Sequence, residues 1–344
     1  GEAISIPYFN ASMRQKLIEA CLFNWGSISP AIFGSLFQAV KSKEARRELG
    51  EHYTTEENIL KLIGPLFLDE LRAEFVRSIH DRAALGRLHE RLGQLRFLDP
   101  ACGCGNFLIV AYRELRALEL EILVRRQELS KKRSQTALVL DEDETVKVRM
   151  PHFHGIELEE WPATIARTAM FLVNHQANQD MSLKIGISPE QLPLSESAHI
   201  VVGNALELDW NSVLPASEDV RVMGNPPFIG ARLMTAEQKA ETNALWPRGK
   251  AGLLDYCAGW YAKAAAYLAD TEQASFAFVT TNSITQGQQV AALFSDLLED
   301  GWTVLFAHRT FTWTSEAANA AAVHCVIVGF TRDTTVRPRL FDYD

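Results

Sequence analysis

The chain has 344 residues, 47% hydrophobic and 22% charged, a composition typical of a globular protein whose core needs no disulfide or metal. Its net charge of −9 excludes a uniformly basic nucleic-acid surface, and its five cysteines include no CxxC pair, which argues against a disulfide framework and a metal site. No apolar run approaches the roughly 20 residues that cross a bilayer, and no signal-peptide pattern opens the chain, so we expect a cytoplasmic protein without membrane contact.

The N-terminal part is predicted to be helical. Residues 11–50 carry apolar residues at helical spacing in two stretches, separated by the turn GSISP. A further helix is predicted to start after Thr54 or Thr55, because a threonine N-cap is followed by acidic residues and then by an apolar stripe.

From about residue 95, short apolar runs alternate with amphipathic helices. Strands are predicted at 95–100, 153–158, 199–206, 220–227, 275–281, 302–309 and 322–330, and helices near 106–128, 161–177, 254–269 and 287–299. This alternation predicts an α/β fold with a mostly parallel seven-stranded sheet and helices on both faces. The last two strands are joined without a helical pattern, so we expect one of them to run antiparallel at an edge.

A glycine-rich turn follows the first of these strands. Asp99 closes the strand, Gly103 and Gly105 let the backbone approach a ligand closely, and Asn106 starts the next helix. Ligands of open α/β sheets bind beyond the carboxyl ends of the strands, where the strand order reverses, so this turn is a candidate binding site. The match to GxGxxG is incomplete, because Leu108 occupies the third glycine position.

Polar residues also close the second and third strands. Glu157 is placed to accept hydrogen bonds from ribose hydroxyls, or alternatively to cap the next helix. It follows the glycines by far more than the 20 or so residues usual in nicotinamide-binding units, which disfavours a dehydrogenase. Asn204 suits either the edge of an adenine ring or a simple turn.

The stretch VMGNPPFIG ends the fourth strand in an amide. Pro226 and Pro227 fix the backbone, so that the side-chain carbonyl of Asn225 and the main-chain carbonyl of Pro226 converge. Two acceptors suit an NH2 group, and accepting its hydrogens favours the rehybridised nitrogen that attacks a methyl sulfonium, with no strong base required. Phe228 offers a ring for stacking on a planar group. The alternative is a polar turn with a buried phenylalanine.

These stretches resemble a known family. DPACGCGNFL, GIELEE, GNALELDW and GNPPFIG, preceded by GEHYTTEENI, are similar to motifs I, II, III, IV and X of the gamma-class DNA N6-adenine methyltransferases. The stretches FNWGSISPAIFGSLFQAV, TNSITQGQQVAALF and FAHRTFTWTSEAANAAAVHCVIVGF resemble MmeI-type restriction-modification polypeptides, in which one chain carries a nuclease, a helical connector, a methyltransferase and a target-recognition domain.

The resemblance implies a Rossmann-like class I fold that transfers a methyl group from S-adenosylmethionine to N6 of adenine in duplex DNA by base flipping. It divides the chain into a helical connector, residues 1–50, and a methyltransferase domain, residues 51–344. Because the chain begins with Gly1 and ends without a clear stop, we expect it to be a piece of a longer polypeptide, fused to a nuclease domain and to a C-terminal target-recognition domain.

The resemblance also assigns site residues. The cofactor residues are Tyr53, Thr54, Asp99, Ala101, Gly103, Gly105, Asn106, Glu157, Asn204 and Ala205. The catalytic residues are Asn225, Pro226, Pro227 and Phe228. Arg309, Phe311 and Trp313 are candidates for lining the DNA side of the cleft or filling the gap left by the flipped base, unless both rings are core.

Two positions depart from the family pattern. Cys104 replaces the usual serine between the glycines, which leaves the backbone contacts intact. Asn204 replaces the usual aspartate and accepts a hydrogen bond without help from a negative charge, which bears on cofactor affinity.

Three alternatives stay open. An N4-cytosine methyltransferase uses the same geometry but usually has serine or aspartate at position 225, and a protein-glutamine N5 methyltransferase usually has tyrosine at position 228. A cofactor-binding scaffold without activity would tolerate erosion of the tetrapeptide 225–228, which is intact.

Overall fold

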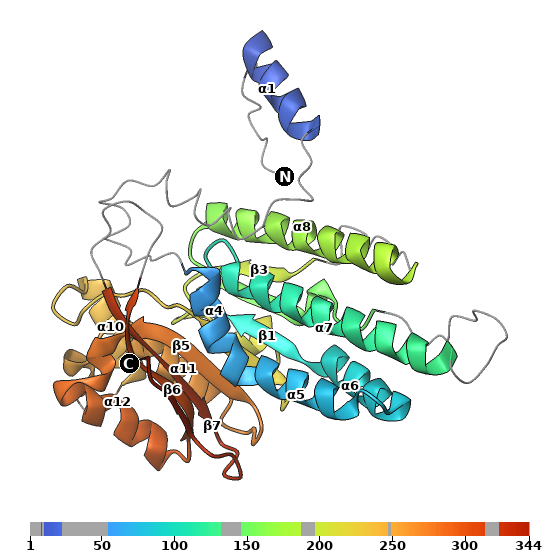
Figure 1. Cartoon of the computed structure of the whole chain (residues 1–344). Helices are drawn as coiled ribbons and strands as arrows, with labels where there is room; N and C mark the ends of the chain where they lie inside the picture. The colour runs from blue at the N-terminus through green and yellow to red at the C-terminus, as the bar shows by residue number, and fades with distance from the viewer. Residues whose placement is uncertain are drawn as a thin grey trace.

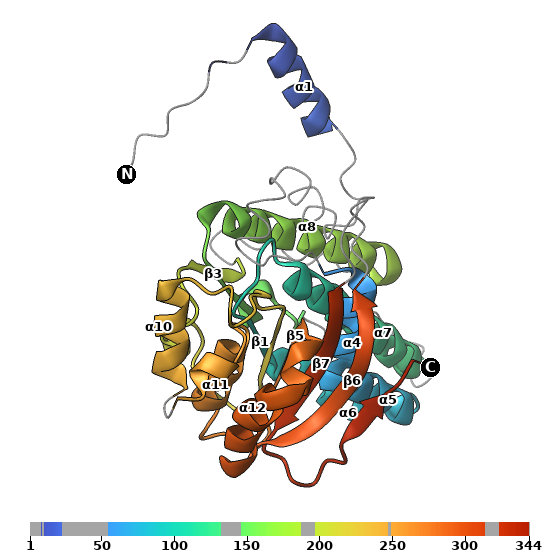
Figure 2. The same ribbon diagram turned by 90° about the vertical axis from the view of Figure 1, so that its left-hand side faces the viewer.

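The computed structural model describes residue 8 and residues 10–22, 54–131, 146–186, 197–246, 249–313 and 323–343. These residues form a mixed α/β structure in which one sheet lies between two layers of helices (Figures 1 and 2). Helix α1 (Ala11–Leu22) confirms the predicted helical start, whereas residues 23–50 of that prediction lie outside the described ranges. The division of the chain at residue 50 stays a prediction.

The sheet has one strand more than predicted. Its strands are β1 (Arg96–Asp99), β2 (Phe153–Glu157), β3 (His199–Val202), β4 (Val220–Gly224), β5 (Ser275–Thr281), β6 (Thr303–Trp313), β7 (Val323–Thr331) and β8 (Arg339–Phe341), in the order β3-β2-β1-β4-β5-β7-β6-β8. The seven-stranded prediction was wrong because β8 has three residues, none of them buried, and therefore gives no apolar run.

Strand β7 runs antiparallel to both of its neighbours, while the other paired strands are parallel. An antiparallel strand was predicted, but its placement at an edge was wrong, because β7 lies between β5 and β6 and the edges are β3 and β8. The run from Cys325 to Thr331 is buried throughout, as expected of a strand that is covered on both faces.

Two hydrophobic cores form, one on each face of the sheet, because successive strand residues point to opposite faces. Phe97 belongs to the first core and its neighbour Leu98 to the second. The first core is built with α4 (Glu56–Ile63), η2 (Gly64–Leu68), α5 (Asp69–Ser78), α6 (Arg82–Gln94), α7 (Asn106–Lys131) and α8 (Glu160–Ile185). The second is built with α9 (Trp210–Val213), α11 (Ala258–Tyr267) and α12 (Gly287–Glu299), and α10 (Ala236–Leu245) packs against α11. Short helical turns η4 (Met150–His152), η5 (Ala251–Leu253) and η6 (Asn282–Thr285) complete the elements.

The helix predicted after Thr54 or Thr55 starts with Thr55 at the N-cap position and is interrupted. Residues Gly64–Leu68 form a π-helical turn, η2, between α4 and α5. Pro65 lies in this turn and has no N–H to continue the regular hydrogen-bond ladder, which accounts for the local change of pitch.

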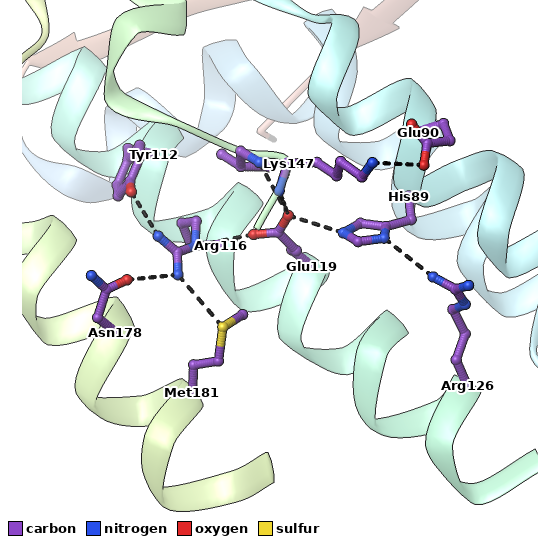
Figure 3. A network of polar contacts seen from close by, with 10 residues as sticks. His89, Glu90, Tyr112, Arg116, Glu119, Arg126, Lys147, Asn178 and Met181 are labelled. Carbon is purple, nitrogen blue, oxygen red and sulfur yellow. Dashed lines mark hydrogen bonds and ion pairs between the residues drawn. The ribbon is translucent and has the colours of Figure 1, made fainter. Parts of the chain in front are cut away.

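A buried polar network joins α6, α7 and the chain at residue 147 (Figure 3). We call the side chains His89, Arg116, Glu119 and Arg126 the Glu119 cluster. Oε1 of Glu119 accepts hydrogen bonds from the backbone N–H groups of Lys147 (2.6 Å) and Val148 (3.0 Å) and lies 3.1 Å from Nε2 of His89. Its Oε2 lies 3.1 Å from Nε of Arg116. Nδ1 of His89 faces Arg126 at 3.4 Å, and because a guanidinium only donates, Nε2 is the nitrogen that carries the proton toward Glu119.

Strand β8 ties the C-terminal part of the described chain to the first layer of helices. Nη2 of Arg339 donates to the carbonyl oxygen of Pro65 at 2.7 Å. The ring of Phe341 stacks on His308 with centroids 4.4 Å apart, and burial lowers the pKa of His308 to about 4, so that this ring is neutral near pH 7. The stack is therefore one of two uncharged rings.

Candidate active site

The candidate site lies at the carboxyl ends of β1 to β4. These strands are parallel, so they end at the same edge of the sheet. The strand order reverses between β1 and β4, since β2 and β3 continue on one side and β5 on the other. This is where open α/β sheets bind ligands, and the four predicted site segments follow these four strands.

The turn after β1 needs glycine at two positions. Gly103 and Gly105 have φ values of 53° and 85°, in the left-handed region that favours glycine. A Cβ on Gly105 would lie 3.0 Å from Ala166 on α8, so the turn packs closely there. A Cβ on Gly103 would meet nothing within 4 Å, so the backbone at that position faces open space. The turn thus leaves room for a ligand beside Gly103.

Asp99 is buried at the end of β1, 1% exposed. Its Oδ1 accepts a hydrogen bond from the N–H of Ala101 at 3.0 Å, while its buried Oδ2 has no hydrogen-bond partner among the described residues. Burial raises the pKa of this carboxyl to about 8, the Ala101 N–H opposes the rise, and the charge of Glu157 adds to it. A Cβ on Gly224 would lie 2.6 Å from Oδ1, so β4 ends directly against this carboxyl.

Glu157 lies against the glycine turn. Its Oε2 accepts a hydrogen bond from the N–H of Gly103 at 2.9 Å, and its Oε1 accepts one from the N–H of Glu159 at 3.0 Å. Asn106, at the start of α7, has a buried Oδ1 without a hydrogen-bond partner in the described part of the chain.

Asn204 is held by contacts that the sequence did not reveal. Its Oδ1 accepts a hydrogen bond from the N–H of Leu206 (3.0 Å), as in the simple turn that was the alternative reading. Its Nδ2 donates to Oε1 of Glu241 on α10 at 2.8 Å, and Oε2 of Glu241 accepts from the hydroxyl of Tyr256 at 2.5 Å. Burial and this hydrogen bond raise the pKa of Tyr256, which keeps it a donor. Ala205 is buried, and its carbonyl accepts from Nε1 of Trp210.

Asn225 is half-buried directly after β4, and Nδ2 of its side chain donates to the hydroxyl of Thr54 at 3.0 Å. Thr54 is 4% exposed, and Tyr53 lies outside the described residues. Pro226 is buried, Pro227 is half-buried, and Phe228 is half-buried against the first core. The structure therefore brings Thr54 together with the tetrapeptide.

The chain beyond the tetrapeptide is braced by Asp255. Its Oδ1 accepts a hydrogen bond from the N–H of Ala231 at 2.9 Å, and its Oδ2 accepts one from the hydroxyl of Ser283. The N–H of Tyr256 donates to the carbonyl of Ile229 at 2.9 Å. Sequence analysis missed Asp255 and Ser283, and the signal available was an acidic residue inside the apolar stretch LLDYCAGW.

The DNA-side candidates lie on β6. Arg309 is exposed and donates to Oδ2 of Asp342 at 2.6 Å. Phe311 is 9% exposed and belongs to the first core, with Nζ of Lys61 lying 5.1 Å from its ring centroid. Its position matches the alternative reading as a core ring. The side chain of Trp313 lies outside the described residues.

The arrangement offers hydrogen-bond acceptors and an open backbone turn. Within the described ranges, no three His, Cys, Asp or Glu side chains come together as a metal-binding group. No helix in the part of the chain that the structure describes combines the length and apolar character needed to cross a membrane.

Residues 75–342 match the family model described as the DNA-methyltransferase domain of MmeI. A curated relative, DNA methyltransferase A of Bacillus subtilis (strain 168), is 41% identical over 341 residues. That match covers 97% of this chain but only 37% of the relative, so the chain spans well under half of that protein's length.

A solved structure of the Type IIL restriction-modification enzyme MmeI in complex with DNA is 46% identical to this chain, with a TM-score of 0.89, over 98% of this chain and 44% of that one. Two more distant structures share the fold alone. They are the DrdV–DNA complex (16% identity, TM-score 0.52, 91% of this chain and 30% of that one) and a type I methyltransferase subunit from Streptococcus thermophilus (13%, 0.52, 97% and 56%). Since the family model covers most of the chain and the motif segments meet at one edge of the sheet, the chain belongs to the family of MmeI DNA-methyltransferase domains.

Proposed function

We propose that the chain transfers a methyl group from S-adenosylmethionine to the exocyclic N6 of adenine in duplex DNA, as the modification part of a restriction-modification system. The observation that carries this proposal is the contact between two motifs. Gly224 lies against Asp99, so the tetrapeptide that begins at Asn225 and the glycine turn that follows Asp99 leave the sheet from neighbouring strand ends.

The cofactor fits the residues beside the glycine turn. S-adenosylmethionine carries an ammonium and a sulfonium group, and both Oδ2 of Asp99 and Oδ1 of Asn106 are buried acceptors without a hydrogen-bond partner in the described structure. The open space at Gly103 lets a ligand approach the backbone, and the carboxylate of Glu157, a group that can accept hydrogen bonds from ribose hydroxyls, lies beside it. The strand order β3-β2-β1-β4-β5 is that of a doubly wound sheet, which supports assigning a Rossmann-like class I fold.

The sulfonium would supply the methyl group and leave as a neutral thioether, and the methylated amino nitrogen would lose one of its two protons to solvent. The chain's own residues place and polarise the acceptor nitrogen: Oδ1 of Asn225 and the carbonyl of Pro226 accept the two hydrogens of the adenine amino group. Accepting both hydrogens draws the nitrogen lone pair out of conjugation with the ring, so that no strong base is needed. Phe228 stacks on the base, which must leave the duplex at a cost of roughly a few kcal/mol.

Target recognition and cleavage belong to other parts of a longer protein in this proposal. The chain covers 44% of the MmeI chain in the solved DNA complex, which leaves room for a nuclease domain and a target-recognition domain. A net charge of −9 also fits a catalytic domain that relies on a partner domain for most of its affinity for DNA phosphates.

The test uses the full-length protein, duplex DNA and S-adenosylmethionine with a labelled methyl group, followed by digestion and chromatography of the nucleosides. We expect labelled N6-methyladenine. Asn225→Ala should lower the rate of transfer at least about 100-fold, as expected when a group that acts in the transition state is lost, while S-adenosylhomocysteine binding measured by calorimetry stays within about twofold.

The exposed Asn243→Ala on α10 is the matched control and should leave the rate of transfer unchanged. Label in N4-methylcytosine would assign the chain as an N4-cytosine methyltransferase, and label in a protein glutamine would assign it as a protein-glutamine N5 methyltransferase. Transfer at the normal rate by Asn225→Ala would remove the catalytic role of this residue.

A further inference from the structure

We infer that Thr54 is a positioning residue for the Asn225 side chain, holding its amide so that the oxygen end faces the target amino group. This inference rests on the proposed function. The resemblance assigns Thr54 to the tail of the cofactor, whereas the structure pairs its hydroxyl with Asn225.

The contact joins two distant parts of the sequence. Nδ2 of Asn225 donates to Oγ1 of Thr54 at 3.0 Å, across 171 residues of chain. Thr54 is 4% exposed, so little water competes for this hydrogen bond. This part-buried bond restrains the side chain at the end of β4 from the start of α4.

The start of helix α4, directly after Thr54, is held in place by an ion pair. Thr55 occupies the N-cap position of α4, with extended backbone angles (φ −67°, ψ 154°), and Glu56 in the first turn accepts two hydrogen bonds from Arg113 of α7, at 2.9 and 2.7 Å. Such paired bonds from one guanidinium fix both distance and orientation. Since α7 also starts at the glycine turn and α4 packs against α7 (Figure 1), α4 and the proposed cofactor turn share one support.

The orientation of the amide decides its chemistry. The two ends of an asparagine amide have nearly the same shape, but only the oxygen accepts a hydrogen bond, and only the NH2 donates two. A half-turn about χ2 would present a donor to the amino group of the base, which is itself a donor. With Nδ2 bonded to Thr54, the oxygen end of the amide points away from Thr54.

The decisive substitution is Thr54→Val in the full-length protein, because valine keeps the shape and removes the acceptor. We expect kcat for methyl transfer to fall about 10- to 100-fold while the dissociation constant of S-adenosylhomocysteine stays within about twofold, since a buried donor left without a partner favours other amide orientations. Thr54→Ser keeps the hydroxyl and should recover most of kcat.

Thr55→Val is the matched control, because the Thr55 side chain is adjacent but makes no hydrogen bond to the helix start. It should leave kcat unchanged. Normal kcat in Thr54→Val would overturn the inference while the proposed function stands. Unchanged kcat with weaker S-adenosylhomocysteine binding would also overturn the inference, and would support the assignment of Thr54 as a cofactor-binding residue.

A second measurement does not depend on activity. The measurement follows the unfolding transition whose Tm S-adenosylhomocysteine raises. Thr54→Val should lower this Tm by about 2–4 °C. The same substitution in an Asn225→Ala background should lower the Tm by much less, because the hydrogen-bond partner of Thr54 is already gone. Equal losses in the two backgrounds would show that the residues are not coupled. An inactive wild-type protein would overturn the proposed function, while this cycle would still decide the contact.

Discussion

Two buried carboxyl groups of this molecule have opposite surroundings. Glu119 is fully buried and contacts a guanidinium, an imidazole and two backbone N–H groups (Figure 3). Asp99 is 1% exposed and accepts a single backbone hydrogen bond, with Glu157 as a neighbouring charge of the same sign. Both sites exclude water, but only the first provides compensation for a negative charge.

The different surroundings of the two carboxyl groups indicate different roles, a structural role for Glu119 and a ligand-binding role for Asp99. A buried carboxylate with all its partners in the protein holds elements together, and the Glu119 cluster links α6, α7 and the chain that enters β2. A buried carboxyl that lacks partners is costly unless something else supplies them. Asp99 lies at the turn where the proposed cofactor would bring positive charge, so the missing partner and the ligand match.

The largest effect should come from removing the Glu119 carboxylate. Glu119→Ala leaves Arg116, His89 and two backbone N–H groups without their acceptor, so we expect a loss of about 3–5 kcal/mol in the free energy of unfolding. Denaturant unfolding, followed through the transition that S-adenosylhomocysteine stabilises, measures it. Glu121→Ala, exposed on the same helix, is the control and should cost little. A loss below about 1 kcal/mol would show that the cluster is not a unit of structure.

Asp99→Asn should have the opposite effect, with little change in stability and a loss of ligand affinity. The side-chain oxygen can still accept from Ala101, and no cationic partner is lost, so we expect unfolding of the cofactor-free protein to change by less than about 1 kcal/mol. Affinity for S-adenosylhomocysteine should fall by about 1.5–3 kcal/mol, the usual value of a hydrogen bond to a charged group. Calorimetry measures it, with the exposed Asp180→Asn as control. Destabilisation as large as that of Glu119→Ala would erase the contrast between the two carboxyls.

The smallest expected effect is a dependence on pH. Because the folded pKa of Asp99 is raised to about 8, its contribution to stability is fully present below its unfolded pKa and is lost as pH rises through about 8. A cationic ligand that binds the ionised carboxylate must displace this proton, so affinity should rise with pH up to about 8, by at most about 1.4 kcal/mol per pH unit. Calorimetry in buffers of different ionisation enthalpy should show proton release at pH 7 that Asp99→Asn abolishes. Equal proton release by both proteins would place the titrating group elsewhere.

Local patterns in the sequence predicted much of this structure. Seven strands were predicted because each contains a short apolar run. Asp99, Glu157 and Asn225 were predicted to share one edge of the sheet because polar residues at the ends of parallel strands converge there. These predictions depend only on neighbours along the chain.

The features that escaped prediction depend on contacts between distant segments. The hydrogen bond from Asn225 to Thr54 spans 171 residues, and Glu241 lies on α10, a helix with a mostly polar sequence. The inner position of β7 is set by which strands it pairs with, and its own apolar residues suit either place. These contacts and strand pairings depend on how distant segments fold together, so no single stretch of sequence reveals them.

The bond from Arg339 to the carbonyl of Pro65 has a practical consequence for anyone who transplants or trims this methyltransferase. A version cut after β7 would keep the predicted motifs yet remove β8 and one hydrogen bond to the π-helical turn that continues α4, the helix that follows Thr54. Active chimeras should therefore retain the sequence through Tyr343, and a protease that nicks the loop before β8 should lower catalysis without touching any catalytic side chain.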